Sequence, residues 1–75
     1  MNFENGKYFP HIANEIRKLI GKKIKYLRNC DIDKSGRNYM FPRTGTITDV
    51  HGKNVEFDHV NWEYSPTIVE YEEIE

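Results

Sequence analysis

The stretch PRTGTITDVHGKNVEFDHV, residues 42–60, decides the fold that we predict for this chain. Two runs rich in β-forming residues, 45–50 and 54–58, flank a short polar connection that contains Gly52. Gly52 provides the positive φ that a tight hairpin turn requires. In the second run Val55 and Phe57 alternate with polar residues, which is typical of a strand with one buried face. The stretch therefore predicts a β-hairpin.

The first strand of this hairpin departs from strict alternation. Ile47 and Val50 stand three positions apart, although side chains on one face of a regular strand recur at every second residue. A β-bulge near Thr48 would turn both side chains inward, and bulges of this kind bend small sheets. We therefore predict that this strand is bulged and bent.

The flanking sequence adds a short helix and further strands. Residues 10–20 begin with a proline and carry Ile12, Ile16, Leu19 and Ile20 at helical spacing, which predicts an amphipathic helix. Segments 22–29 and 67–74 are predicted strands, 38–42 is apolar enough to be extended, and 59–66 is predicted to be a turn. Residues 1–9 are expected to be a loose N-terminus. These elements predict a mainly β protein, a small barrel of four to five antiparallel strands with one short N-terminal α-helix.

A family resemblance supports this architecture. The run from Gly45 to Gly52, followed by Val55 and Phe57, resembles the central hairpin of SH3-like barrels and is especially similar to that of KOW-type domains. The segment FPRTGTI, residues 41–47, belongs to a region from 20 to 75 that resembles short SH3-like proteins of bacteriophage and prophage genomes. The resemblance implies a single SH3-like domain over residues 10–75, with the helix at 10–20 and the barrel at 22–75. It also implies a binding role, toward a protein or, as in KOW domains, toward RNA.

Length and composition limit the possible functions. A chain of 75 residues with 10 aromatic side chains forms one small domain with a modest core. It contains no apolar stretch long enough to cross a membrane and no segment typical of a secretory signal. The single cysteine, Cys30, forms no disulfide within the chain, so we expect a cytoplasmic protein.

Charge is divided unevenly along the chain. Residues 1–45 hold ten Lys or Arg and four Asp or Glu, a net charge of +6, whereas residues 46–75 hold one Lys and eight Asp or Glu, a net charge of −7. This division can mark a nucleic-acid surface and an acidic tail. Alternatively, the two halves pack together and neutralise each other across strands. The nucleic-acid hypothesis names as candidates Lys22, Lys23, Lys25, Tyr26, Arg28, Arg37 and Arg43, with Tyr26 available to stack on a base.

The sequence offers little support for catalysis. No spacing of His and Cys residues matches a metal site, and the run DIDKSGR resembles a calcium loop only in its first six positions. Cys30 with His59 or His11 would be a nucleophile–base pair, but we expect Cys30 to pack as a small hydrophobe. His51 is expected to be solvated. We therefore predict a protein that is not an enzyme and has no cofactor or metal.

Protein binding is the leading functional hypothesis. Exposed Trp and Tyr side chains are enriched at binding hot spots, although Trp62 fits a core position equally well. Acidic residues near the C-terminus can instead mimic nucleic-acid phosphates, or form only the solvent face of the last strand. The candidates for protein binding are Tyr39, Phe41, Trp62, Tyr64, Glu70, Glu72 and Glu73. The prediction is an adaptor or inhibitor of phage or prophage type that binds a host protein as a monomer or homodimer, with nucleic-acid binding as the alternative.

Overall fold

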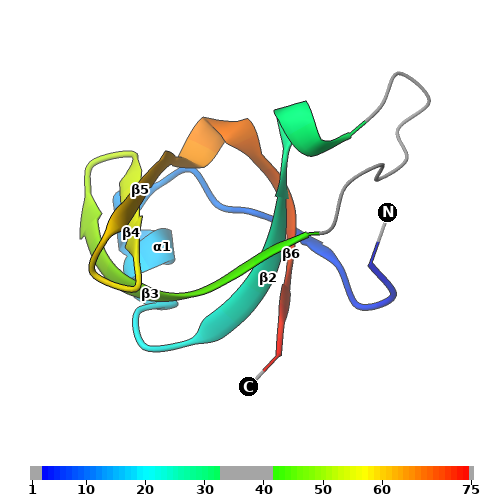
Figure 1. Ribbon diagram of the computed structural model, residues 1–75. Helices are drawn as coiled ribbons and strands as arrows, with labels where there is room; N and C mark the ends of the chain where they lie inside the picture. The colour runs from blue at the N-terminus through cyan, green and yellow to red at the C-terminus, as the bar shows by residue number, and fades with distance from the viewer. Residues whose placement is uncertain (1–2, 33–41, 75) are drawn as a thin grey trace.

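The computed structural model describes residues 3–32 and 42–74. Its strands form one antiparallel sheet in the order β1-β6-β2-β3-β4-β5 (Figure 1). The elements are β1 (Lys7–Tyr8), α1 (Ala13–Arg17), β2 (Lys23–Arg28), the 3-10 turn η1 (Asn29–Asp31), β3 (Arg43–His51), β4 (Asn54–Phe57), β5 (Asn61–Tyr64), the 3-10 turn η2 (Ser65–Thr67) and β6 (Ile68–Glu73). The prediction of a mainly β, antiparallel protein with one short helix is confirmed, and residues 3–32 and 42–74 contain six strands rather than the four to five predicted.

Strand β3 bends the sheet. Its residues 43–46 pair with β2, while its residues 47–51 pair with β4, and the register shifts between Ile47 and Asp49. This is the predicted bulge, and it leaves both Ile47 and Val50 buried, at 0% and 4% exposure. Because β3 belongs to both halves of the sheet, the bulge turns one half toward the other, and the sheet curves around α1 (Figure 1).

Two tight turns connect β3, β4 and β5. Gly52 has a φ of +59° in the β3–β4 turn, as predicted. In the β4–β5 turn Asp58 and His59 have φ values of +56° and +62°, and the Val60 N–H donates to the Phe57 oxygen at 3.1 Å. Consecutive positive φ values are typical of a type I′ turn.

The β4–β5 turn corrects one prediction. Segment 59–66 was expected to be a turn throughout, but residues 61–64 form β5 and pair with β4. The sequence contains no glycine at this turn, so the usual signal for an immediate return of the chain is missing. Asp58 stabilises the turn instead. Its carboxylate accepts the Thr46 N–H at 3.0 Å, and its own N–H donates to the Thr46 oxygen at 2.9 Å.

The N-terminal segment is ordered against the sheet, which corrects the prediction of a loose terminus. Lys7 and Tyr8 pair with β6, and Phe3 and Phe9 are buried at 8% and 3% exposure. Helix α1 is also shorter than the predicted 10–20, because it spans five residues and continues as turns to Gly21, whose φ is +91°. Two apolar rings give the N-terminal segment enough buried area to hold it in place.

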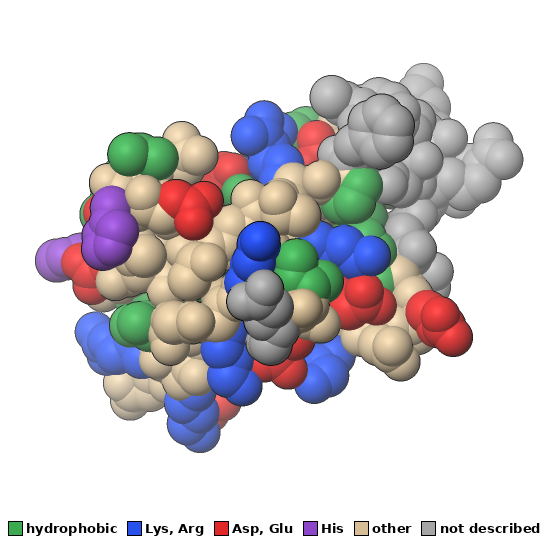
Figure 2. All heavy atoms as spheres, turned by 60° about the horizontal axis from the view of Figure 1, so that its bottom comes forward, with side chains coloured by type: hydrophobic (Ala, Val, Ile, Leu, Met, Phe, Trp, Pro, Cys, Tyr) green, Lys and Arg blue, Asp and Glu red, His purple; other side chains and the backbone are tan. Residues whose placement is uncertain are grey.

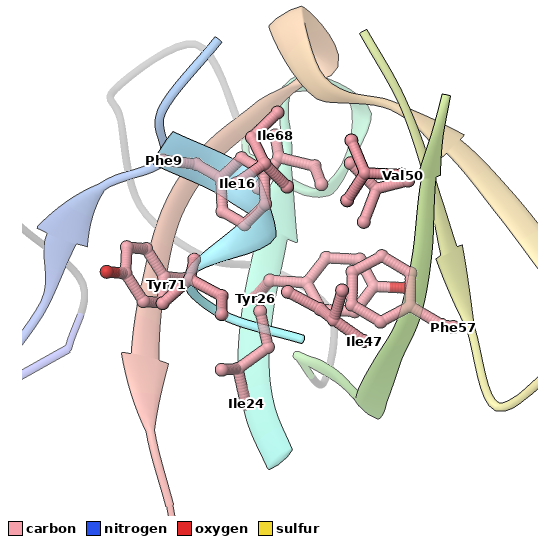
Figure 3. Close-up of a cluster of buried hydrophobic side chains, with 11 residues drawn as sticks. Phe9, Ile16, Ile24, Tyr26, Ile47, Val50, Phe57, Ile68 and Tyr71 are labelled. Atoms are coloured by element: carbon pink, nitrogen blue, oxygen red, sulfur yellow. The ribbon is translucent and has the colours of Figure 1, made fainter. Parts of the chain in front are cut away.

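The core lies between the curved sheet and α1 (Figure 3). Ile16 of α1 is fully buried. The rings of Tyr26 and Phe57 stack with centroids 4.5 Å apart, and the rings of Phe9 and Tyr71 meet edge to face at 5.4 Å. These contacts join β2 to β4 and the N-terminal segment to β6. Aromatic side chains therefore link segments that are far apart in the sequence.

Candidate functional site

The basic residues of β2 and the acidic residues of β6 face each other across the sheet. Lys25 lies opposite Glu72 in the strand register, and its Nζ is 3.2 Å from that carboxylate. Lys22 Nζ is 2.8 Å from Glu73. Hydrogen bonding between Lys22 and Glu73 raises the pKa of Lys22 and lowers the pKa of Glu73. The uneven charge of the two halves is therefore neutralised in part across strands, and Figure 2 shows blue and red side chains interspersed on the face it presents.

The other nucleic-acid candidates are scattered. Lys23 and Arg43 are exposed, but Arg28 pairs with Asp31 at 3.2 Å. Tyr26 is only 2% exposed, so the prediction that its ring is available to stack on a base is corrected. Arg37 lies outside the described residues. The described candidates do not form a continuous basic surface with an exposed aromatic ring.

The acidic candidates are used internally. Glu70 is 3% exposed, which overturns the prediction that the alternating glutamates form a solvent face. Its Oε2 accepts the Phe3 N–H at 2.8 Å, and Glu72 Oε2 accepts the Asn5 N–H at 2.9 Å. This hydrogen bond, together with Lys25, lowers the pKa of Glu72. The two carboxylates thus hold the N-terminal segment on the outer side of β6, and Glu70 is not available to mimic a phosphate.

The outer face of β3, β4 and β5 gathers exposed aromatic and polar side chains. Residues opposite each other in neighbouring antiparallel strands share a face of the sheet. By the register, this surface consists of Asp49, His51, Asn54, Glu56, Trp62 and Tyr64, and we call it the aromatic face. Trp62 and Tyr64 are 48% and 50% exposed. Trp62 therefore belongs to the surface and not to the core.

A shallow depression lies at the centre of the aromatic face. It has a volume of about 400 Å³ and is lined by His51, Asn54 and Trp62. The rings of His51 and Trp62 meet edge to face, with centroids 5.7 Å apart. His51 is exposed, as predicted, but neither it nor Asn54 was identified as a site residue. The register places Asn54 opposite Tyr64 of β5 and His51 opposite Asn54, but reading it from the sequence required recognising residues 61–64 as a strand.

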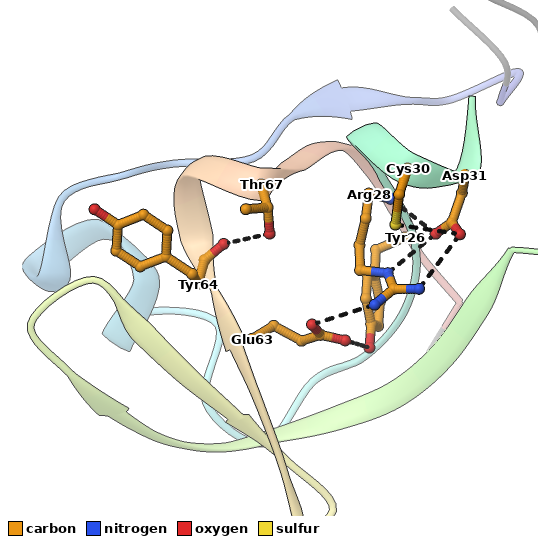
Figure 4. Close-up of polar contacts among 7 residues, drawn as sticks. All are labelled: Tyr26, Arg28, Cys30, Asp31, Glu63, Tyr64 and Thr67. Atoms are coloured by element: carbon orange, nitrogen blue, oxygen red, sulfur yellow. Dashed lines mark hydrogen bonds and ion pairs between the residues drawn. The ribbon is translucent and has the colours of Figure 1, made fainter. Parts of the chain in front are cut away.

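A partly buried polar cluster holds β5 in place behind the aromatic face (Figure 4). Glu63 lies between Trp62 and Tyr64 in the strand and therefore points inward. Its Oε2 accepts the Tyr26 hydroxyl at 3.1 Å, and its Oε1 is 3.7 Å from Arg28 Nη1. Burial, and then the charge of Glu63, raise the pKa of Tyr26. Because Glu63 is anchored to β2, the two aromatic side chains on either side of it are held outward.

The same cluster continues to η1. Burial opposes ionisation of Asp31, but its hydrogen bonds from Arg28 outweigh this effect and lower the pKa of Asp31. Cys30 is exposed, which corrects the expectation that it packs as a small hydrophobe. Its Sγ lies 3.9 Å from Asp31 Oδ1, and the neighbouring Asp31 is buried and pairs with Arg28.

Tyr39 and Phe41, the remaining protein-binding candidates, lie outside the described residues. Within residues 3–32 and 42–74, no group of three or more His, Cys, Asp or Glu side chains is placed to hold a metal ion. No helix in the same part of the chain is long and apolar enough to cross a membrane. Comparisons with protein-family models, with curated proteins and with solved structures found no match to this chain.

Proposed function

We propose that this protein is a small, non-catalytic binding module that docks a protein partner through its aromatic face. The observation that carries the proposal is the pair Trp62 and Tyr64, both half exposed on the same side of strand β5, which ends the sheet. Large rings left in solvent are a cost to an isolated small domain and a gain when a partner covers them. Trp and Tyr are the residue types most enriched at binding hot spots.

The exposed area of the two rings is large enough for them to act as binding hot spots. With about half of each ring exposed, roughly 100 Å² of Trp62 and a similar area of Tyr64 can be removed from water, worth ~2 kcal/mol per ring before the cost of association is subtracted. The anchoring of Glu63 to Tyr26 and Arg28 keeps β5 in one position. A rigid surface loses less conformational entropy on binding than a mobile one.

Electrostatics favour a protein over a nucleic acid as the partner. The aromatic face includes the carboxylates of Asp49 and Glu56, which repel phosphates. Lys22 and Lys25, which lie on the opposite half of the sheet, are already paired with glutamates. The resemblance to short phage and prophage proteins suggests the biological setting, an adaptor or inhibitor that acts on a host protein.

From the same resemblance we also propose the fold family, an SH3-like barrel. It is supported by the bulged β3, by the tight β3–β4 hairpin and by the curvature of the sheet. Further support comes from Glu63, which binds Tyr26 and so draws the last strand of the sheet toward the centrally placed β2. An experimental structure in which the sheet stays open between its two ends would reject barrel closure.

The function can be tested by affinity capture from a nuclease-treated lysate of the source organism. The protein and matched variants serve as baits. Trp62→Ala and Tyr64→Ala should each reduce capture of the same protein about tenfold or more. Tyr8→Ala is the control, because Tyr8 is 77% exposed but lies on β1 at the other end of the sheet. Equal capture by all variants, or loss of every captured species on nuclease treatment, would reject the proposal.

A further inference from the structure

The fixed charges of the aromatic face are all negative. Asp49 and Glu56 contribute its two carboxylates, and none of its residues is Lys or Arg. His51 Nε2 lies 3.3 Å from Asp49 Oδ2, and His59 Nδ1 lies 3.6 Å from Glu56 Oε1, so each carboxylate has an imidazole beside it. Lys53 occupies the adjoining turn rather than the face. A partner thus meets exposed aromatic rings beside negative charge.

One of these carboxylates lies beside the depression, next to the His51 ring that forms part of its lining. His51 contacts both this carboxylate and the indole, with its ring 5.7 Å from the Trp62 ring and its Nε2 3.3 Å from Asp49 Oδ2. The Asp49 side chain is 49% exposed. Glu56 is less accessible, since its Oε1 accepts the Thr48 hydroxyl at 2.8 Å and its side chain is only 16% exposed. Asp49 is therefore the carboxylate that an incoming group reaches most easily.

We infer that the depression receives an arginine side chain of the protein partner, an inference that rests on the proposed function. A guanidinium is planar and weakly hydrated, so it stacks on the face of an indole and still presents its edge N–H groups to a carboxylate. Trp62 provides the ring and the Asn54 amide oxygen an acceptor in the lining. Asp49 lies at the border of the depression, beyond His51, and provides the carboxylate. A lysine ammonium is compact and strongly hydrated, and it uses this flat site less well.

A nucleobase is the main competing occupant, because it also stacks on tryptophan. Its phosphates, however, would lie against Asp49 and Glu56, which are unfavourable neighbours for a polyanion. A second copy of the chain is the other competitor, since β5 ends the sheet. Oligothymidine binding would reveal the first occupant, and a dependence of the fluorescence on protein concentration would reveal the second.

Trp62 is the chain's single tryptophan, so intrinsic fluorescence reports on this depression alone. The probes are the capped peptide Gly-Ser-Arg-Ser-Gly and the same peptide with citrulline, an uncharged isostere, in place of arginine. The arginine peptide should change the fluorescence saturably and bind about tenfold more tightly than the citrulline peptide. Asp49→Asn keeps an acceptor for the Val50 N–H, which Asp49 Oδ1 binds at 2.8 Å, and should abolish the preference for arginine.

The result separates this inference from the proposed function. Equal binding of the two peptides, no change up to millimolar arginine peptide, or tighter binding of a short oligothymidine would overturn the arginine assignment. A fluorescence change that depends only on protein concentration would also overturn it, because a second copy would then cover the face. If Trp62→Ala still abolishes partner capture in any of these cases, the protein-binding function stands without the arginine.

Discussion

Removing the Glu63 carboxylate should destabilise this protein by a large part of its total stability. In Glu63→Ala the Tyr26 hydroxyl, on a residue that is 2% exposed, loses the acceptor that lies 3.1 Å away. An unsatisfied buried donor costs about 1–3 kcal/mol. The ion pair with Arg28 is longer, at 3.7 Å, and Arg28 keeps Asp31, so this loss adds less than ~1 kcal/mol. We expect a total near 2–3 kcal/mol, against about 3–5 kcal/mol for a domain of this size.

The assay is urea unfolding followed by the fluorescence of Trp62, which lies next to Glu63 in β5. With a slope near 1 kcal/mol per molar urea, the midpoint of Glu63→Ala should fall by about 2–3 M. Glu63→Gln is the matched control, because its amide oxygen still accepts the Tyr26 hydroxyl, and it should lose about 1 kcal/mol or less.

A double-mutant cycle with Tyr26→Phe identifies the source of the effect. If the cost of Glu63→Ala comes from the stranded hydroxyl, then removing that hydroxyl recovers part of the stability, and the cycle should give a coupling energy of about 1–2 kcal/mol. Additivity within about 0.3 kcal/mol would show that the hydrogen bond contributes nothing specific. Equal destabilisation by Glu63→Gln and Glu63→Ala would refute the reasoning in a different way, since charge alone would then matter.

Three further outcomes are expected. Gly6→Ala places a methyl group against the Glu70 carboxylate, and this carboxylate cannot move without releasing the Phe3 N–H. Hydrogen exchange at the Phe3 amide should therefore accelerate at least tenfold, whereas the control Asn5→Ala should leave the exchange rate unchanged. The folded state raises the pKa of Tyr26 and of Tyr71, so it keeps both neutral where the unfolded chain ionises. The contribution of these tyrosines to stability should be constant below about pH 10 and fall above it by ~1.4 kcal/mol per pH unit for each tyrosine, and Tyr26→Phe should reduce this slope in urea titrations. His59→Gly relieves the strain of a φ of +62° but increases the conformational entropy of the unfolded chain. The net gain in stability should be about 0.5–1 kcal/mol, seen as a higher Tm by calorimetry, while the control His59→Ala, which loses the same imidazole, should give no gain.

Much of the β3–β4 hairpin could be predicted from the sequence, because its signals are local. The spacing of Ile47 and Val50 predicted the bulge, and Gly52 predicted the positive φ of the turn. In both cases a residue's own conformational preference, or the period of one strand, is sufficient information. The mainly β class follows from the same local patterns.

The candidate site was predicted only in part. Trp62 and Tyr64 were named from their residue type and from their place in a predicted turn, and the structure leaves both half exposed. His51 and Asn54 were missed as their neighbours, because the β4–β5 turn uses Asp58 and His59 at positive φ where glycine or asparagine is usual. A strand that follows an unrecognised turn is easily taken for a continuation of that turn.

By itself the sequence determined which residues form the central hairpin and that aromatic side chains hold a small β domain together. Only the tertiary structure decided that Glu70 is buried under Phe3, a residue 67 positions away, and that Lys25 meets Glu72 across β2 and β6. The physical reason is that alternation and turn preferences act over a few residues, whereas the pairing of distant strands depends on the register of the whole sheet. That register converts two oppositely charged halves of the chain into neutral pairs and leaves the aromatic face of β3, β4 and β5 exposed to a partner.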